Sequence, residues 1–346
     1  MVELAQARIA EVLHAARRRN ASDVHLRPGA PPSLRIDGLL HPMPGPAVDA
    51  TEAQAICELM LSDAACARLE ERGDATHAYA DDRYGRVRVH AFRTGGGTAL
   101  ALRLLATEVR SLESLGLPAS VAALSDLSGG LVLITGPTGS GKTTALAALV
   151  DRINRRHAKH IITVEDPIEY RYDSHRSVVN QREVGSDTPS FSCAVYGALR
   201  SDPDVLLIGE LRDRETMHAA LTAAETGHLV LATLHTGDAA GSIDRLAGSF
   251  EPSLQSQIRV QLAQTIAAVV CLRLVRRAGG EGRVCAAEVL LACDATRAVI
   301  RDGKSHQIKN VLTTQRQMGM QTLEANLAEL VARREITAQA AQEAVA

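Results

Sequence analysis

Short runs of consecutive apolar residues alternate with helix-forming stretches through the middle of the chain. The apolar runs have the length of strands that are buried on both faces, and they cover residues 131–134, 161–164, 205–208 and 229–233. The stretches between them predict helices over residues 142–155, 190–200 and 213–226. Because strands that alternate with helices build parallel sheets, this part is predicted to be α/β, with a mostly parallel sheet and helices on both faces.

In the first third of the chain, apolar and polar residues alternate one by one, which is typical of strands with one exposed face. This alternation predicts strands over residues 22–26, 33–36, 86–90 and 99–104. The pair Asp37-Gly38 is a hairpin-turn signal, and the second strand is expected to return through Leu39-Leu40. With helices predicted over residues 4–19 and 51–71, this part is a small α+β unit.

The predicted elements divide the chain into two domains, and 346 residues are enough for two domains of ordinary size. We expect an N-terminal α+β domain over residues 1–107, a linker over residues 108–118, and an α/β domain over residues 119–346. The last hundred residues of the second domain are predicted to be helical, including Leu323–Arg334.

Composition and charge narrow the classes of function. The net charge is −2 and aromatic residues make up 2% of the chain, which disfavours direct binding of nucleic acid. The six cysteines contain no C-x-x-C pair, which argues against a zinc ribbon. The longest apolar stretch in the C-terminal third, residues 266–272, is too short to cross a bilayer. We therefore expect membrane association only through partners.

The most specific motif runs from Gly136 to Thr143 and matches the P-loop pattern G-x-x-x-x-G-K-[ST]. It lies between a predicted strand and a predicted helix, so backbone N–H groups and the positive end of the helix point at a phosphate chain. Lys142 is expected to reach the β- and γ-phosphates of a nucleotide, and the Thr143 hydroxyl to bind Mg²⁺. The predicted nucleotide-binding residues are Gly136, Pro137, Thr138, Gly139, Ser140, Gly141, Lys142, Thr143 and Thr144.

Acidic residues follow two of the predicted strands, where ligands collect in open α/β sheets. Glu165 and Asp166 end the strand at residues 161–164, and a carboxylate there can activate a water for attack on a γ-phosphate. Such a pair is also typical of a turn or a helix cap. Glu210 follows the next strand and matches a Walker B acid, with Gly209 where many P-loop enzymes carry aspartate. The predicted metal-binding residues are therefore Thr143 and Glu210.

Two histidines, His228 and His235, bracket the last predicted strand. A shared metal ion is disfavoured because they stand at opposite ends of the strand with no cysteine nearby. For each histidine three roles remain open. It can be a neutral imidazole that donates to a phosphate oxygen, a subunit contact, or a purely structural residue.

Together these motifs resemble the type II/type IV secretion ATPase superfamily, and within it the PilT pilus-motor family. The resemblance covers nearly the whole chain. Besides the P-loop, its most specific stretches are Ala21–Leu26, the Asp box Ile162–Glu169, Val179–Gly185, the Walker B run through Asp213, the His box Leu221–Thr236, Gly303–Ile308 and Met318–Leu323.

The resemblance implies a RecA-like P-loop NTPase domain joined to a smaller PAS-like N-terminal domain, with ATP and Mg²⁺ bound between the two domains. It implies a homo-hexamer in the cytoplasm, at the cytoplasmic face of the inner membrane, with a platform membrane protein of a pilus machine as partner. In such a motor, ATP hydrolysis drives domain rotation and pilus retraction, with twitching motility as the result.

The resemblance also implies roles for single residues. Glu165 would act as general base, and Glu210 would position water and Mg²⁺. His228 and His235 would couple the nucleotide state to domain rotation. The arginines that would reach the γ-phosphate from the N-terminal domain are Arg88, Arg93 and Arg103.

Several alternatives stay open. The segment A-I-R-N-L, which the family links to retraction, stands here as Ala295–Val299 with the sequence A-T-R-A-V. An assembly or secretion ATPase, or an accessory PilT paralogue, is therefore an alternative, although the tetracysteine zinc insert of assembly and secretion ATPases is not expected here. Two other classes are a RecA-like nucleic-acid translocase, which the charge disfavours, and a nucleotide-binding regulator without turnover, which Glu165 and Glu210 disfavour.

Overall fold

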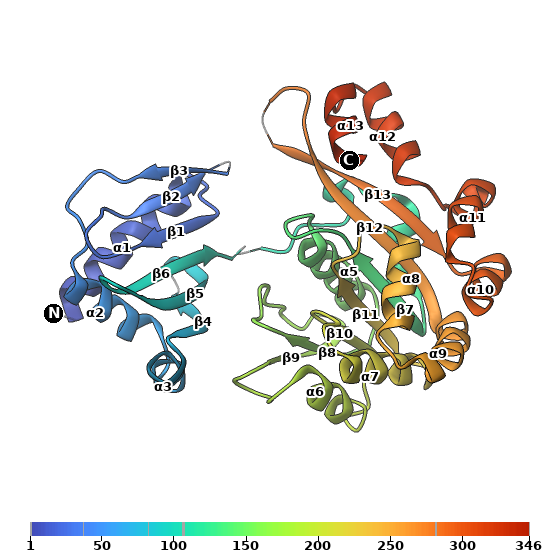
Figure 1. The fold of residues 1–346 in the computed structure, drawn as a ribbon, viewed down its shortest axis with the longest axis horizontal. Coiled ribbons are helices and arrows are strands. Elements are labelled where there is room, and N and C mark those ends of the chain that lie inside the picture. The colour runs from blue at the N-terminus through green and yellow to red at the C-terminus, as the bar shows by residue number, and fades with distance from the viewer. Residues whose placement is uncertain (1, 37, 82, 106–107, 281, 346) are drawn as a thin grey trace. The chain divides into compact units, whose positions relative to one another are not determined.

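The computed structural model describes residues 2–36, 38–81, 83–105, 108–280 and 282–345. The chain folds as two compact units (Figure 1). The first consists mainly of the residues up to Glu108, and the second mainly of the residues from Val109 on. The elements of the first unit are α1 (Val2–Arg18), β1 (Asp23–Leu26), β2 (Ser33–Ile36), β3 (Leu39–Pro42), α2 (Ala50–Met60), α3 (Asp63–Arg72), β4 (Asp74–Asp81), β5 (Gly85–Thr94) and β6 (Gly97–Leu104).

In the first unit an antiparallel sheet of order β3-β2-β1-β6-β5-β4 has one face covered by the three helices. Alternate residues of β5, such as Val87, Val89 and Ala91, are buried against the helices. The residues between them, such as Arg88, lie on the other face. The predicted β2–β3 hairpin is confirmed, although Asp37 of its turn lies outside the described residues. Strand β4 was not predicted, because its polar and small residues carry little hydrophobic alternation.

The second unit contains a longer series of elements. In chain order they are η1 (Glu113–Leu115), α4 (Ala119–Ala123), η2 (Leu124–Asp126), β7 (Gly130–Thr135), α5 (Lys142–Arg156), β8 (His160–Glu165), β9 (Val178–Glu183), α6 (Phe191–Ala198), β10 (Val205–Ile208), α7 (Arg214–Glu225), β11 (Leu229–Leu234), α8 (Ala239–Gly248), α9 (Pro252–Thr265), β12 (Ile266–Arg276), β13 (Arg283–Leu291), α10 (Asp294–Arg301), η3 (Ser305–Gln307), α11 (Ile308–Thr314), η4 (Arg316–Met318), α12 (Leu323–Ala332) and α13 (Ala338–Val345).

The sheet of the second unit has the order β13-β12-β7-β11-β10-β8-β9. All neighbouring strands are parallel except β12 and β13. Successive residues of β7 enter two different cores: Leu131 and Leu133 pack with α6, α7 and α9, while Val132 and Ile134 pack with α5. The predicted parallel sheet with helices on both faces is therefore confirmed. It also aligns the carboxyl ends of β7, β11, β10 and β8 along one edge.

The prediction that the last hundred residues are helical is wrong for β12 and β13. These strands form an antiparallel hairpin, on which α12 and α13 pack (Figure 1). The apolar run Ile266–Leu272 suits a buried strand and a buried helix equally by periodicity. Pairing with β7 decides in favour of the strand.

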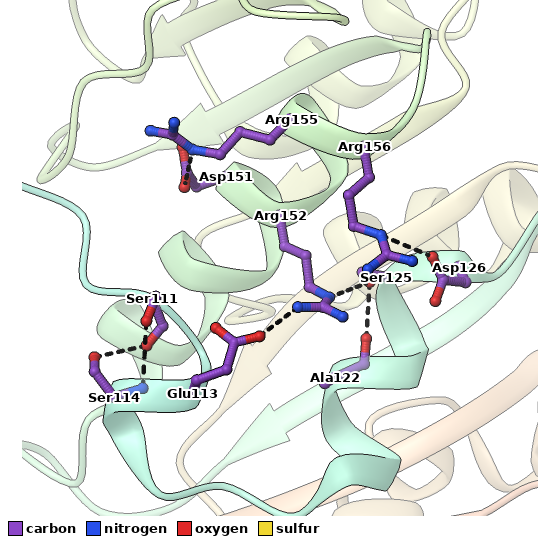
Figure 2. Close-up of polar contacts among 10 residues, drawn as sticks. All are labelled: Ser111, Glu113, Ser114, Ala122, Ser125, Asp126, Asp151, Arg152, Arg155 and Arg156. Atoms are coloured by element: carbon purple, nitrogen blue, oxygen red, sulfur yellow. Dashed lines mark hydrogen bonds and ion pairs between the residues drawn. The ribbon is translucent and has the colours of Figure 1, made fainter.

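The segment predicted as a linker is partly held by the second unit. Leu112 is buried in the core beneath α5. Arg152 of α5 donates to Glu113 at 2.5 Å and to Ser125 at 3.1 Å, and Arg156 lies 3.7 Å from Asp126 (Figure 2). Residues 112–126 are thus bound to the helix that begins at the P-loop. The end of the predicted first domain, residues 106 and 107, lies outside the described residues.

Candidate active site

The P-loop curls around its own lysine at the start of α5. Lys142 is buried, and its Nζ donates to the carbonyls of Gly136 at 2.9 Å and Pro137 at 3.0 Å. The loop turns through residues with positive φ, at Gly139 (+78°) and Gly141 (+95°), which glycine adopts without steric cost. This turn places the ammonium group beside the N-terminus of α5, where backbone N–H groups and the helix dipole favour a phosphate.

Position 136 requires glycine for two reasons, its backbone conformation and the lack of space for a side chain. Its φ is +139°, and an added Cβ would lie 2.5 Å from the Leu272 carbonyl oxygen of β12. We expect Gly136→Ala to lower the free energy of unfolding by about 3 kcal/mol. Gly139→Ala is the control, because open space surrounds that position and only the backbone cost of about 1 kcal/mol remains. Chemical denaturation measures both, and equal losses would show that the contact with β12 does not matter.

A continuous chain of polar contacts crosses the carboxyl edge of the sheet. The Lys142 ammonium lies 3.4 Å from His235 Nδ1, and His235 Nε2 lies 3.2 Å from Glu210 Oε1. Glu210 Oε2 accepts from Arg212 Nε at 2.7 Å, and Arg212 also lies 3.5 Å from Asp166. The order of these groups follows the order of the strands that precede them, β7, β11, β10 and β8. The predicted P-loop, His box, Walker B and Asp box residues thus meet through side chains.

The contacts of His235 assign its tautomer. Nδ1 accepts from the Lys142 ammonium, so the ring proton is placed on Nε2, which donates to Glu210. His235 therefore connects the lysine of the P-loop to the Walker B carboxylate.

Glu165 lies at the end of β8 and is buried. Its Oε1 accepts from Thr163 Oγ1 at 2.7 Å and from Gln181 Nε2 at 3.2 Å, which holds the carboxylate in one orientation. Sequence analysis did not assign these two partners. Thr163 could have been found from its spacing, because it is two residues before Glu165 on the same strand face. Gln181 comes from β9, which was not predicted as a strand.

Gly209 explains how Glu210 comes close to the Asp box. An added Cβ at Gly209 would lie 3.3 Å from the Val164 carbonyl oxygen and 3.4 Å from Glu165 Cα. An aspartate at this position would be crowded by β8. The neighbouring strands β8 and β10 therefore bring the carboxylates of Glu165 and Glu210 to this edge, in addition to Asp166.

His228 lies at the other end of β11 from His235. Its carbonyl accepts from Gly130 at the start of β7, and its Nδ1 lies 2.9 Å from the Ala223 carbonyl and 3.0 Å from Thr226 Oγ1. At about 3.3 Å per residue, β11 separates the two histidines by roughly 20 Å. The structure therefore does not bring His228 to the P-loop edge.

The predicted arginines of the first unit fall on two faces of its sheet. Arg88 of β5 stands opposite Arg103 of β6, on the face that the helices leave uncovered. Arg103 donates to Asp23 at 3.0 Å. Arg93 stands opposite Thr98, whose hydroxyl donates to Gln54 of α2. Arg88 and Arg103 are thus neighbours, while Arg93 lies on the face that carries the helices.

A family model described as type II/IV secretion system protein matches residues 3–344. The chain belongs to this family. It is 40% identical to the type IV pilus retraction ATPase PilT of Pseudomonas aeruginosa over 97% of each chain. It is also 40% identical to a twitching motility protein of Neisseria gonorrhoeae, over 90% of this chain and 83% of that one.

Solved structures agree with this membership. A crystal structure of the pilus retraction motor PilT with bound ADP matches 96% of each chain, with a TM-score of 0.89 and 41% identity. The DotB ATPase of Legionella pneumophila matches 98% of this chain and 95% of that chain, with a TM-score of 0.82 and 26% identity. The chain is therefore a nucleotide-binding ATP hydrolase with the predicted α/β, RecA-like fold. The PAS-like description of the first unit stays a prediction.

Two further observations concern the described residues only. Within them, no group of three or more histidine, cysteine, aspartate or glutamate side chains is arranged to hold a metal ion. Among the helices that the structure describes, none combines the length and the apolar character that crossing a bilayer requires.

Proposed function

We propose that this ATPase is a motor that drives the retraction of a type IV pilus. The observation that carries the proposal is the contact chain from Lys142 through His235 to Glu210, in a protein that matches a retraction ATPase over nearly its whole length. The match to the type II secretion protein E of Pseudomonas aeruginosa is narrower and covers 75% of this chain. This difference favours retraction over secretion.

The reaction of the motor is hydrolysis of ATP to ADP and phosphate. Lys142 binds β- and γ-phosphate oxygens at the start of α5, in exchange for its carbonyl contacts. Glu165 accepts a proton from the water that attacks the γ-phosphorus, the bond to the ADP oxygen breaks, and Glu210 orients the water. Thr143 and Glu210 would hold Mg²⁺, which neutralises charge on the phosphate oxygens when bound.

The proposal includes an assembly and a location. We infer a homo-hexamer at the cytoplasmic face of the inner membrane, joined to the membrane through a platform protein of the pilus machine and without direct contact with nucleic acid. Support comes from the similarity to PilT and DotB. In the proposed ring, His235 reports the phosphate state to Glu210 through its contacts with Lys142 and Glu210.

Deletion of the gene in its own organism tests the direction of the motor. Retraction predicts cells that are hyperpiliated and lack twitching motility, because pili extend and are not withdrawn. Bald cells would contradict retraction and support an assembly motor. An ATPase assay cannot separate the two, since both motors hydrolyse ATP.

A second candidate is an accessory motor. The chain is 35% identical to the type IV pilus ATPase PilU of Pseudomonas aeruginosa over 92% of its length. In addition, α10 differs from A-I-R-N-L at three of five positions and keeps Arg297, which donates to the Ala263 and Gln264 carbonyls at the end of α9. An accessory role predicts that the deletion reduces motility without abolishing it.

A further inference from the structure

Arg212 also belongs to the chain of polar contacts at the carboxyl edge of the sheet, and the sequence analysis assigned it no role in the reaction. It lies two residues after Glu210 and directly before Asp213, the N-cap residue of α7. Its guanidinium contacts Glu210 at 2.7 Å and Asp166 at 3.5 Å, so it joins the acids that follow the neighbouring strands β10 and β8. The hydrogen bond to Glu210 raises the pKa of Arg212, which keeps the cation charged.

The backbone on both sides of Arg212 is anchored. On one side Leu211 is buried and donates to the Thr233 carbonyl of β11 at 3.0 Å. On the other side Asp213 accepts from the Thr216 N–H at 2.8 Å and from its hydroxyl at 2.9 Å. The base of the arginine side chain is therefore held in place, and less conformational entropy is lost when its guanidinium binds two carboxylates.

This arrangement differs from an ordinary surface ion pair. Arg214, two residues further on, is equally exposed, at 55% against 56% for Arg212, but it contacts the single exposed carboxylate of Glu251 at 3.1 Å. Such a pair contributes about 0–1 kcal/mol. Arg214 is thus a matched control for the charge and exposure of Arg212.

We propose that Arg212 is a positioning residue for ATP hydrolysis. It fixes the Glu210 carboxylate through Oε2, which leaves Oε1 in contact with His235. It also places a positive charge between the Glu210 and Asp166 side chains, which offsets part of their repulsion from the negative phosphate chain. This inference rests on the proposed role of Glu210 in hydrolysis.

The readout that separates positioning from a merely structural role is the difference between the effect on kcat and the effect on ATP binding. Arg212 contacts Glu210 and Asp166, whereas Lys142 and the P-loop backbone are the groups that bind the phosphates. Loss of a residue that only positions Glu210 is therefore expected to lower kcat and to leave the affinity for ATP unchanged.

The test uses the full-length protein in its assembled form. We expect R212Q to lower kcat about 10- to 100-fold, the loss that corresponds to a hydrogen bond with a charged group. Its affinity for ATP is expected to be retained, because Lys142 and the P-loop backbone are unchanged. R212K keeps the charge without the fork geometry, so it is expected to restore part of the lost kcat but not all of it. R214Q should behave like the unaltered protein.

Binding of ATP separates positioning from loss of structure, because a variant with a disrupted P-loop would also lose its affinity for ATP. Equilibrium binding of ATP should be unchanged in R212Q. A kcat of R212Q equal to that of R214Q, an R212K variant no faster than R212Q, or a loss of ATP affinity as large as the loss of kcat, would overturn the inference. Failure of the unaltered protein to hydrolyse ATP would instead refute the proposed function.

Discussion

Replacing Glu210 by glutamine is expected to lower kcat for ATP hydrolysis by about 10²–10⁴-fold while ATP remains bound. The amide has the size of the carboxylate, but it cannot attract a water proton or a metal ion as strongly. Because Lys142 and the P-loop backbone are unchanged, the affinity for ATP should be retained. Phosphate release under saturating ATP measures the first effect, and equilibrium binding of a labelled nucleotide measures the second.

The matched control for this variant is Glu225→Gln. Glu225 is the last residue of α7, away from the P-loop edge, and it accepts a hydrogen bond from Gln261 at 2.7 Å. This substitution should leave hydrolysis unchanged. Equal hydrolysis by E210Q and the unaltered protein would show that the Walker B carboxylate is not part of the reaction.

The second large effect is expected from the first unit. Arginines that stabilise the developing charge in phosphoryl transfer contribute 10³–10⁵ in rate, so Arg88→Ala and Arg103→Ala should each lower hydrolysis by about this factor. The fold should survive both changes, because Arg103 loses only its pair with Asp23, which is 3.0 Å long and worth about 0–1 kcal/mol. Steady-state hydrolysis and thermal unfolding measure the two quantities.

Arg93→Ala tests whether the position on the sheet decides the effect. The resemblance to the family assigns Arg93 the same role, but its side chain lies on the face of the sheet that carries the helices. From the structure we expect a much smaller loss for this variant. A loss as large as that of Arg88→Ala would mean that the two faces of the sheet contribute equally.

The positions of these arginines were partly readable from the sequence. In a regular strand, residues an odd number of positions apart face opposite sides. Arg88 and Arg93 are five residues apart on β5, so their separation could have been predicted. The pairing of Arg88 with Arg103 depends on the register between β5 and β6, which local pattern leaves open.

Local chemistry was enough for the P-loop and for the strands that surround it. A glycine-rich turn between an apolar run and a helix has few conformations. Positive φ angles favour glycine at Gly136, Gly139 and Gly141, and a close backbone contact also requires it at Gly136. The four buried strands were predicted correctly because their apolar runs are shorter than most helices. The run at β12 was missed because a buried strand and a buried helix share the same composition.

By itself the sequence determined a phosphate-binding loop, a parallel sheet around it and a set of acids and histidines at strand ends. Only the tertiary structure decided which of these groups meet. The strand order β7-β11-β10-β8 puts His235 between Lys142 and Glu210, and Arg212 between Glu210 and Asp166. The physical reason is that the order of parallel strands is set by pairing between strands that long crossover connections separate, which no pattern within one strand encodes.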